Sequence, residues 1–380
     1  MINRADRTGF AAWWFTVDRV ALLAMLALIS IGLLLAFASS TAISGGPGSA
    51  GDFRYALRQI SYAVLAVGIL AGASMLSLRN IKILAAVVFA GALVGSFLVL
   101  LIGDEMYGAR RQLNLGLFNL QPSEFLKPSF AVLAAAVLAD RGKLPVPAPV
   151  LTFLLILPAL AILLLQPDVG QTGLLLCLWG AMLFFWGLPL IWVGAMAASA
   201  GGLGLAAYFL FPHVHNRVNQ YLGHSETGYQ AGLALKAFAE GGLTGVGPGA
   251  GTIKYRLPDA HSDFVFATAG EEFGLLLCAT IAALFCLLTV RLLLRAAAAR
   301  EGFAQLAGAG LAIVTAVQAF INMGVAVSLL PAKGMTLPFI SYGGSSLFAM
   351  ALTMGLALAL TRHRPKISVR ADGVLQWARA

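Results

Sequence analysis

Ten apolar runs divide this 380-residue chain, and most of them are long enough to cross a lipid bilayer as a helix. A spanning helix needs roughly 20 apolar residues, and in lipid it must satisfy its own backbone hydrogen bonds. Only 11% of the residues are charged and 59% are apolar, whereas a soluble domain carries about 25% and about 45–50%. This balance excludes a soluble enzyme, a disordered chain, a coiled coil and a disulfide scaffold. We predict an all-α polytopic membrane protein with spans at residues 20–40, 60–78, 83–103, 125–139, 148–166, 170–188, 190–211, 264–290, 304–330 and 344–361.

Basic residues indicate how these spans are oriented. The chain has 25 Lys and Arg against 16 Asp and Glu, which gives a net charge of +9. Cytoplasmic loops of membrane proteins carry an excess of Lys and Arg. With the N-terminus inside, the cytoplasmic segments hold 15 of the 25 basic residues and 5 of the 16 acidic ones. We therefore predict one N-in, C-in domain over 1–380 and no nucleic-acid partner, with cytoplasmic tails 1–19 and 362–380 and a large extracytoplasmic loop 212–263.

The large loop carries its own pattern. Its stretch from Ala231 to Phe238 is rich in apolar residues and is typical of an interfacial helix. Six glycines follow between 241 and 251 without the Gly-Lys-Ser/Thr ending of a phosphate-binding loop. They indicate close backbone approach or an adaptable loop. His213 and His215 form only a pair, which is weak support for a metal site.

Asp263 is the strongest catalytic candidate because it lies at the start of the eighth span. A general base must be a carboxylate or imidazole within reach of the proton that it takes. The partial positive charge of a helix N-terminus also favours a carboxylate there. The alternative is that Asp263 or Ser262 only caps the helix. Both roles stay open, and they do not exclude each other.

Glu271 and Glu272 lie about 12 Å deeper in the same span, if it is helical. Ionisable residues at membrane depth are candidates for function. The alternative is a buried hydrogen bond or ion pair between helices, and the residues alone favour this structural role. Glu124 and Lys127, near the start of the fourth span, are candidate partners.

Five basic residues form a set on the outward side of the predicted topology. Arg suits bidentate contacts with phosphate, and Lys acts as a point charge. Without further information, contact with anionic lipid headgroups explains such a set better. Its members are Arg110, Arg111, Lys254, Arg256 and Lys333.

Several polar sequence motifs along the chain resemble the signature motifs of the SEDS family, the shape, elongation, division and sporulation proteins. The resemblance covers nearly the whole chain and preserves the order of the blocks. Within the family, the closing block and Trp13 to Arg19 resemble the cell-division subfamily more than the elongation subfamily. The motifs are Gly108-Ala109 with Arg111, Gln121-Pro122-Ser123-Glu124 with Lys127, Gln166-Pro167-Asp168, Gly228-Tyr229-Gln230, Leu257-Pro258 with Ala260-His261-Ser262-Asp263-Phe264, Glu271-Glu272, and Pro331-Ala332-Lys333-Gly334 through Ser341-Tyr342-Gly343-Gly344.

This resemblance implies ten transmembrane helices and a peptidoglycan glycosyltransferase that polymerises lipid II outside the cytoplasmic (inner) membrane, at the division septum. It implies a class B penicillin-binding protein and other divisome membrane proteins as partners, and Asp263 as the catalytic residue. For the substrate and its diphosphate we expect Arg111, Lys254, Arg256, Lys333, His261, Ser262, Gln121 and Ser123. For structural polar roles we expect Glu124, Lys127, Glu271, Glu272, Ser341 and Tyr342.

Two positions depart from the family pattern. Gln112 follows Arg111 where the family often has Trp, so a stacking surface for sugar must be missing or supplied elsewhere. Tyr255 stands where many division members carry an acidic residue, so no second carboxylate acts there.

The residues fit an inverting displacement in which Asp263 takes the proton of the acceptor hydroxyl and cations stabilise the leaving diphosphate. A divalent cation, Mg or Mn, stays open as a cofactor. Two competing functions also stay open: a lipid II flippase, although no inverted repeat is evident, and a scaffold without chemistry that recruits the transpeptidase.

Overall fold

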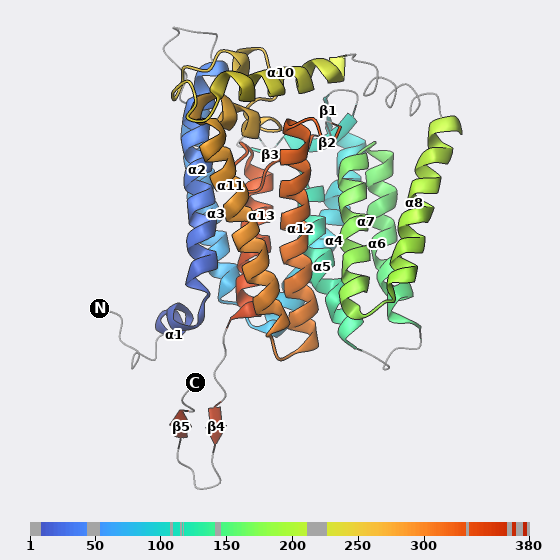
Figure 1. Cartoon of the computed structure of the whole chain (residues 1–380). Coiled ribbons are helices and arrows are strands. Elements are labelled where there is room, and N and C mark those ends of the chain that lie inside the picture. Colours follow the sequence, from blue (N-terminus) through green and yellow to red (C-terminus); the bar gives the residue numbers. More distant parts are fainter. Residues whose placement is uncertain are drawn as a thin grey trace.

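The computed structural model describes residues 9–43, 54–106, 109–114, 116, 118–140, 146–210, 226–331, 334–362, 367–369 and 375–377. Long helices run side by side between two ends of the molecule, and α10 lies across one end (Figure 1). The helices are α1 (Gly9–Thr16), α2 (Arg19–Ile43), α3 (Arg54–Ser74), α4 (Leu78–Ile102), α5 (Ser123–Ala139), α6 (Ala148–Leu165), α7 (Val169–Trp186), α8 (Leu190–Leu210), α10 (Glu226–Gly241), α11 (Val265–Ala297), α12 (Gly302–Ala326) and α13 (Gly344–Thr361).

Each predicted apolar run overlaps one of these helices. Within the described ranges, eight helices are long and apolar enough to cross a membrane: α2, α3, α4, α6, α7, α11, α12 and α13. Helix α5 has 17 residues and contains Pro128. The predicted helix between Ala231 and Phe238 is confirmed, because α10 covers this stretch.

Short strands add to the predicted all-α fold. A three-stranded antiparallel sheet follows α4, in the order β1 (Asp104–Met106), β2 (Ala109–Asn114) and β3 (Asn119–Leu120). It lies at the same end of the bundle as α10 (Figure 1). Strands β4 (Ile367–Val369) and β5 (Leu375–Trp377) pair near the opposite end. The expectation of helices alone was therefore incomplete, since polar connections satisfy their backbone by strand pairing.

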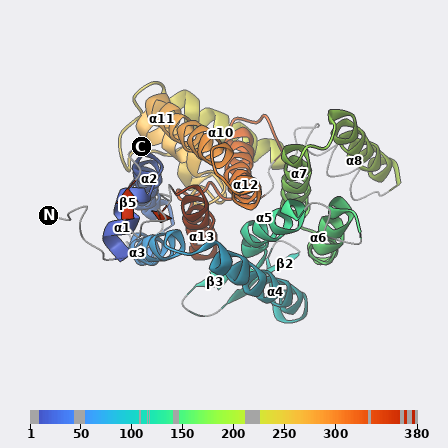
Figure 2. The same cartoon turned by 90° about the horizontal axis from the view of Figure 1, so that it is seen from below.

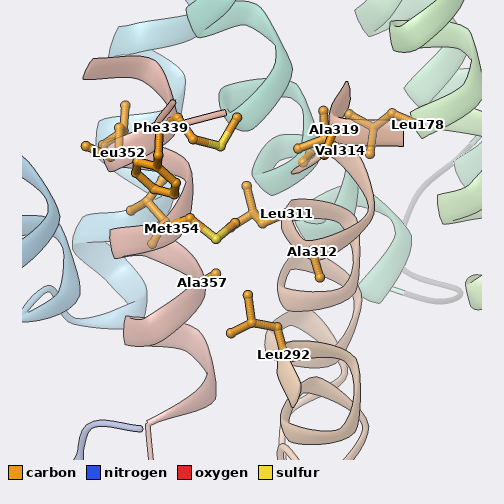
Figure 3. Close-up of a cluster of buried hydrophobic side chains, with 14 of the residues drawn as sticks. Leu178, Leu292, Leu311, Ala312, Val314, Ala319, Phe339, Leu352, Met354 and Ala357 are labelled. Atoms are coloured by element: carbon orange, nitrogen blue, oxygen red, sulfur yellow. The ribbon is translucent and has the colours of Figure 1, made fainter. Parts of the chain in front are cut away.

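Helix α13 forms the centre of the bundle. All of its residues except Phe348 are buried, and α3, α5 and α12 surround it when the bundle is viewed along its axis (Figure 2). Side chains from α7, α11, α12 and α13 meet in one apolar cluster (Figure 3). Gly355 allows the close approach of α3, because a methyl group there would lie 2.7 Å from the Leu70 carbonyl oxygen.

Helix α11 corresponds to the predicted span over 264–290 and is broken inside it at Gly274. Gly274 has φ 75° and ψ −177°, a conformation that essentially only glycine adopts. The loop after α10 satisfies the backbone at the break: Leu275 N–H donates to the Gly242 carbonyl at 2.9 Å, and Gly247 N–H donates to the Glu272 carbonyl at 3.0 Å. Non-helical backbone at membrane depth is tolerated where protein satisfies it in this way.

The glycine cluster of this loop serves close backbone approach, as one of the two sequence interpretations predicts. A methyl group at Gly241 would lie 1.9 Å from the Gly270 carbonyl oxygen, and one at Gly245 would lie 2.2 Å from the Glu272 carbonyl oxygen. Real side-chain atoms do not approach backbone so closely. The loop therefore packs directly against the first turns of α11, which follow Asp263.

Candidate functional site

Asp263 lies in the turn that leads into α11, and its backbone is held from two sides. Its N–H donates to the Asp259 carbonyl at 3.0 Å, and its carbonyl accepts from the Asn322 side-chain amide at 2.9 Å. The N-cap of α11 is Phe264, and no side chain caps the helix. The structure therefore does not use Asp263 or Ser262 as the helix cap, and the capping interpretation loses its support.

The environment of Asp263 shifts its protonation toward neutrality. Burial and the negative charge of Asp259 together raise the pKa of its carboxyl to about 7, against the opposing positive charge of Arg111. Within the described ranges no hydrogen bond reaches either carboxylate oxygen. A carboxylate whose pKa lies near the working pH, with its oxygens available, has the properties of a general base.

Arg111 on β2 faces the same point as Asp263. A methyl group at Gly334 would lie 3.5 Å from Asp263 Oδ2 and 3.8 Å from Arg111 Nη1, so the two groups meet over this glycine. The guanidinium also donates from Nη2 to the Pro167 carbonyl at 3.0 Å. Its Nε lies 3.9 Å from Asp168 Oδ2. Arg111 is thus oriented by the turn between α6 and α7 and presents its charge beside Asp263.

Asp168 is a third acidic group of the site. It is the N-cap of α7 and accepts from the Gln171 N–H at 3.2 Å. Burial raises the pKa of its carboxyl, and the charge of Arg111 opposes this shift. The preceding Pro167 has a φ of +24°, which is a strained backbone conformation at this turn.

A buried polar network lies below these groups and joins three helices. Lys127 Nζ donates to Glu124 Oε2 at 2.8 Å and to Gln318 Oε1 at 2.7 Å. Gln171 donates to Glu124 Oε1 at 2.6 Å, and Gln318 donates to the Thr336 carbonyl at 3.1 Å. The predicted structural role of Glu124 and Lys127 is consistent with this placement: they pair with each other.

The polar residues before α13 pack against those before α11. Tyr342 N–H donates to the His261 carbonyl at 3.0 Å, and the Ser341 hydroxyl donates to the Ser262 carbonyl. Burial lowers the pKa of His261, so its imidazole is neutral at pH 7. Burial raises the pKa of Tyr342 to about 12. These two loops hold His261 and Ser262 in place beside Asp263.

Lys254 lies in a separate cluster, although the sequence predicts it as a diphosphate contact. Its ammonium pairs with Glu272, and both side chains are 0% exposed. It also donates to the Ala38 carbonyl at 2.8 Å. Glu271 accepts from the N–H groups of Thr252 and Ile253 at 2.5 and 2.7 Å. The two glutamates therefore tie the loop to α11 and do not pair with Lys127, the partner suggested by the sequence.

Three of the remaining predicted substrate contacts are among the described residues. Arg256 is exposed and reaches the Tyr229 hydroxyl of α10 at 3.5 Å. Gln121 N–H donates to the Ser345 hydroxyl at 3.0 Å, and Ser123 is the buried first residue of α5. Lys333 lies outside the described residues, as do His213 and His215.

The part of the chain that the structure describes contains no group of three or more His, Cys, Asp or Glu side chains placed to hold a metal ion. We therefore assign no step to a divalent cation. Gln318 and Asn322 are site residues that sequence reasoning missed. Their spacing of four places both polar side chains on one face of an otherwise apolar helix, and this signal could have identified them.

Comparison with known proteins gives consistent matches along the chain. The family model described as cell cycle protein, which covers FtsW, RodA and SpoVE, matches residues 19–366. A probable peptidoglycan glycosyltransferase FtsW of Caulobacter vibrioides is 43% identical over 95% of this chain and 93% of the relative. One from Thiomicrospira cyclica is 37% identical over 90% and 91%.

Solved structures share the fold. A chain from a study of the structural coordination of polymerization and crosslinking by a peptidoglycan synthase complex has a TM-score of 0.77 at 29% identity, covering 91% of this chain and 97% of that one. The rod shape determining protein RodA of Thermus thermophilus has a TM-score of 0.67 at 28% identity, covering 92% and 97%. The family model and these relatives cover almost the full length of the chain. The chain therefore belongs to the FtsW/RodA/SpoVE family, which is the SEDS family that its polar sequence motifs resemble.

Proposed function

We propose that this protein is a peptidoglycan glycosyltransferase of the cell-division type, which polymerises lipid II. The relatives are named as probable peptidoglycan glycosyltransferases. The observation that carries the proposal is the pair over Gly334, where a carboxyl with a pKa of about 7 faces a guanidinium. A base for the incoming hydroxyl and a cation for the outgoing phosphate are the two groups that such a transfer needs.

The reaction is a single inverting displacement. The 4-hydroxyl oxygen of the acceptor sugar attacks the anomeric carbon of the donor, and Asp263 takes its proton. The bond between the anomeric carbon and the diphosphate oxygen breaks, and the electron pair leaves with the polyprenyl diphosphate. Arg111 is placed to stabilise this growing negative charge.

The other predicted cations divide into two groups. Arg256 is exposed on the same loop and stays a proposed contact to the diphosphate, as does Lys333. Lys254 is already paired in a buried position. We therefore assign it to holding the loop, together with Glu271 and Glu272. Gln121, Ser123, His261 and Ser262 stay proposed substrate contacts, and Ser341 and Tyr342 support them.

The topology that fits this reaction has ten membrane-spanning helices with both termini in the cytoplasm. Helices α5 and α8 join the eight long apolar helices. Asp18, Arg291 and Arg295 then meet at the cytoplasmic end, and Asp263 lies outside. We place the protein in the bacterial cytoplasmic membrane at the septum. The similarity to a chain of a peptidoglycan synthase complex supports a class B penicillin-binding protein as its partner.

The test is polymerisation of purified lipid II in detergent, with the partner present. Wild-type protein should form glycan strands, and Asp263→Asn should form none while it elutes as the same monodisperse peak and still binds the partner. Strands from the Asp263→Asn variant at the wild-type rate would exclude Asp263 as the base. Absence of strands from the wild type would instead favour a flippase or a scaffold.

A further inference from the structure

Three aromatic side chains meet beside the proposed base, and they come from three separate segments. Tyr55 lies in the first turn of α3, His261 precedes α11, and Tyr342 precedes α13. The ring centroids are 5.5 Å apart for Tyr55 and Tyr342, 5.7 Å for His261 and Tyr342, and 6.4 Å for Tyr55 and His261. All three side chains are half-buried, so this aromatic triad keeps a surface for a ligand.

A buried acceptor without a partner lies next to this triad. Gln59, one turn along α3 from Tyr55, is 1% exposed. Its amide nitrogen donates to the Ser341 carbonyl at 3.4 Å, and its Oε1 has no hydrogen-bond partner among the described residues. An unpaired buried acceptor costs about 1–3 kcal/mol. A donor from a bound molecule, such as a hydroxyl or amide, would remove this cost.

The polar rim of the triad has donors of its own. Arg58 is exposed, and its positive charge acts on the Tyr342 hydroxyl. The Tyr342 hydroxyl stays protonated because burial raises its pKa to about 12. The surface thus combines aromatic faces with hydroxyl and guanidinium donors. This is the chemistry that recognises a hexose ring, which has an apolar C–H face and a polar edge.

The triad and Arg111 approach Asp263 from different parts of the bundle. His261 is two residues before Asp263, and its partners lie on α3 and before α13. Arg111 instead contacts the turn between α6 and α7. Figure 2 shows α3 on the opposite side of α13 from α6 and α7. If the leaving diphosphate lies at Arg111, the sugar that gives its proton to Asp263 lies on the side of the triad.

We propose that Tyr55, His261 and Tyr342, with Gln59 beneath them, form the subsite for the acceptor hexose ring. This inference rests on the proposed glycosyltransferase function and adds to it. The triad provides the sugar-stacking surface for which Gln112 offers no aromatic ring. It binds the acceptor ring beside Asp263, which takes the proton of the 4-hydroxyl.

The test separates the two substrates of the transfer. An acceptor-only probe is lipid II whose anomeric oxygen is replaced by carbon, so that the diphosphate cannot leave. A donor-only probe is lipid II without its 4-hydroxyl. Loss of one aromatic contact should weaken binding by about 0.5–1.5 kcal/mol, or about 2- to 12-fold. Tyr55→Leu should therefore raise the KM for the acceptor-only probe by this factor, with the KM for the donor-only probe and the kcat unchanged.

Two further variants make the result specific. Tyr55→Phe keeps the ring and should restore the wild-type KM. Phe184→Leu removes an exposed aromatic of α7 that is remote from the triad and should change neither KM. Tyr55→Met provides the same comparison if the leucine variant does not elute as a monodisperse peak.

The outcomes are distinct. Unchanged KM values in Tyr55→Leu, or a rise confined to the donor-only probe, would overturn the acceptor subsite while leaving the proposed function intact. Wild-type protein that joins no sugars would overturn the function itself.

Discussion

The buried ion pair between Lys254 and Glu272 joins the loop before Asp263 to α11. Both side chains are 0% exposed. In the Lys254→Met variant, Glu272 keeps one hydrogen bond, from the Gly249 N–H at 3.0 Å. It loses its cation, and the Ala38 carbonyl loses a donor at 2.8 Å. The variant therefore leaves a buried carboxylate with one hydrogen bond and no cation.

Breaking a buried pair by removing one partner costs about 3–5 kcal/mol. This cost falls on the segment that Glu271 and Glu272 hold through the N–H groups of Gly249, Thr252 and Ile253. If the cost appears as local opening, these amides should exchange with solvent about 10²–10⁴-fold faster in Lys254→Met than in wild type.

Hydrogen exchange followed by mass spectrometry on peptides that cover 246–254 measures this effect in detergent. Arg110→Met is the matched control, because Arg110 and Glu105 are 3.9 Å apart with side chains 45% and 63% exposed. Such a surface pair contributes about 0–1 kcal/mol. The double variant Lys254→Met with Glu272→Gln removes the uncompensated charge and should exchange more slowly than Lys254→Met alone. Equal protection of 246–254 in wild type and Lys254→Met would refute the reasoning.

Two further predictions concern the backbone break and the cytoplasmic end. Gly274→Ala should strongly lower the midpoint temperature of unfolding, since φ is 75° and the methyl group would lie 2.3 Å from the Leu243 carbonyl oxygen. In the control Gly72→Ala, in α3, the methyl group meets nothing within 4 Å and should leave the midpoint unchanged. A normal midpoint for Gly274→Ala would contradict the described break. Asp18→Ala should lower the free energy of unfolding by about 1–2 kcal/mol, because it removes the cap of α2 and the acceptor of Arg291 and Arg295. Asp18→Asn, which keeps the cap, should lower the free energy of unfolding less. The midpoint temperature of unfolding should therefore be higher for Asp18→Asn than for Asp18→Ala.

Most of the helices could be predicted because lipid leaves few alternatives. An apolar run at membrane depth must form a helix, and the observed bounds lie within about six residues of the predicted ones at nearly every end. Helix α1 was missed because eight residues carry too weak a pattern. Strands β1 to β3 were missed because their residues alternate poorly between apolar and polar.

The break in α11 was not predictable from local pattern. The glycines of the outward loop indicated close approach, but the chain segment that they approach is set by tertiary packing around Gly274. The glutamates at 271 and 272 indicated a buried polar contact, and their partners, Lys254 and the loop amides, became visible only in the structure.

The candidate site was predictable in residue type more than in arrangement. Asp263 and Arg111 were both named from the sequence, and the structure places them over one glycine. Lys254 joined the predicted cations by residue type alone, because a sequence does not reveal that an ammonium is buried and paired. Tyr55 gave no signal, since an aromatic residue at a helix start is common at membrane interfaces.

The central claim is that the Asp263 carboxylate is the base, and the pH dependence of kcat/KM tests it most directly. With a pKa of about 7 in the free enzyme, kcat/KM should rise about tenfold per pH unit below pH 7 and level off above it. Asp259 raises this pKa and Arg111 lowers it. Asp259→Asn should therefore move the acid limb to lower pH, and Arg111→Gln should move it to higher pH.

The charge of Asp259 acts on the pKa of His261, and the charge of Arg111 acts on the pKa of Asp168. The pKa of Asp263 depends on both charges. Asparagine also suits position 259, where φ is 54°. Opposite shifts of the limb in the two variants would identify Asp263 as the titrating base. A flat profile through pH 7, or a limb that stays in place in either variant, would contradict the account.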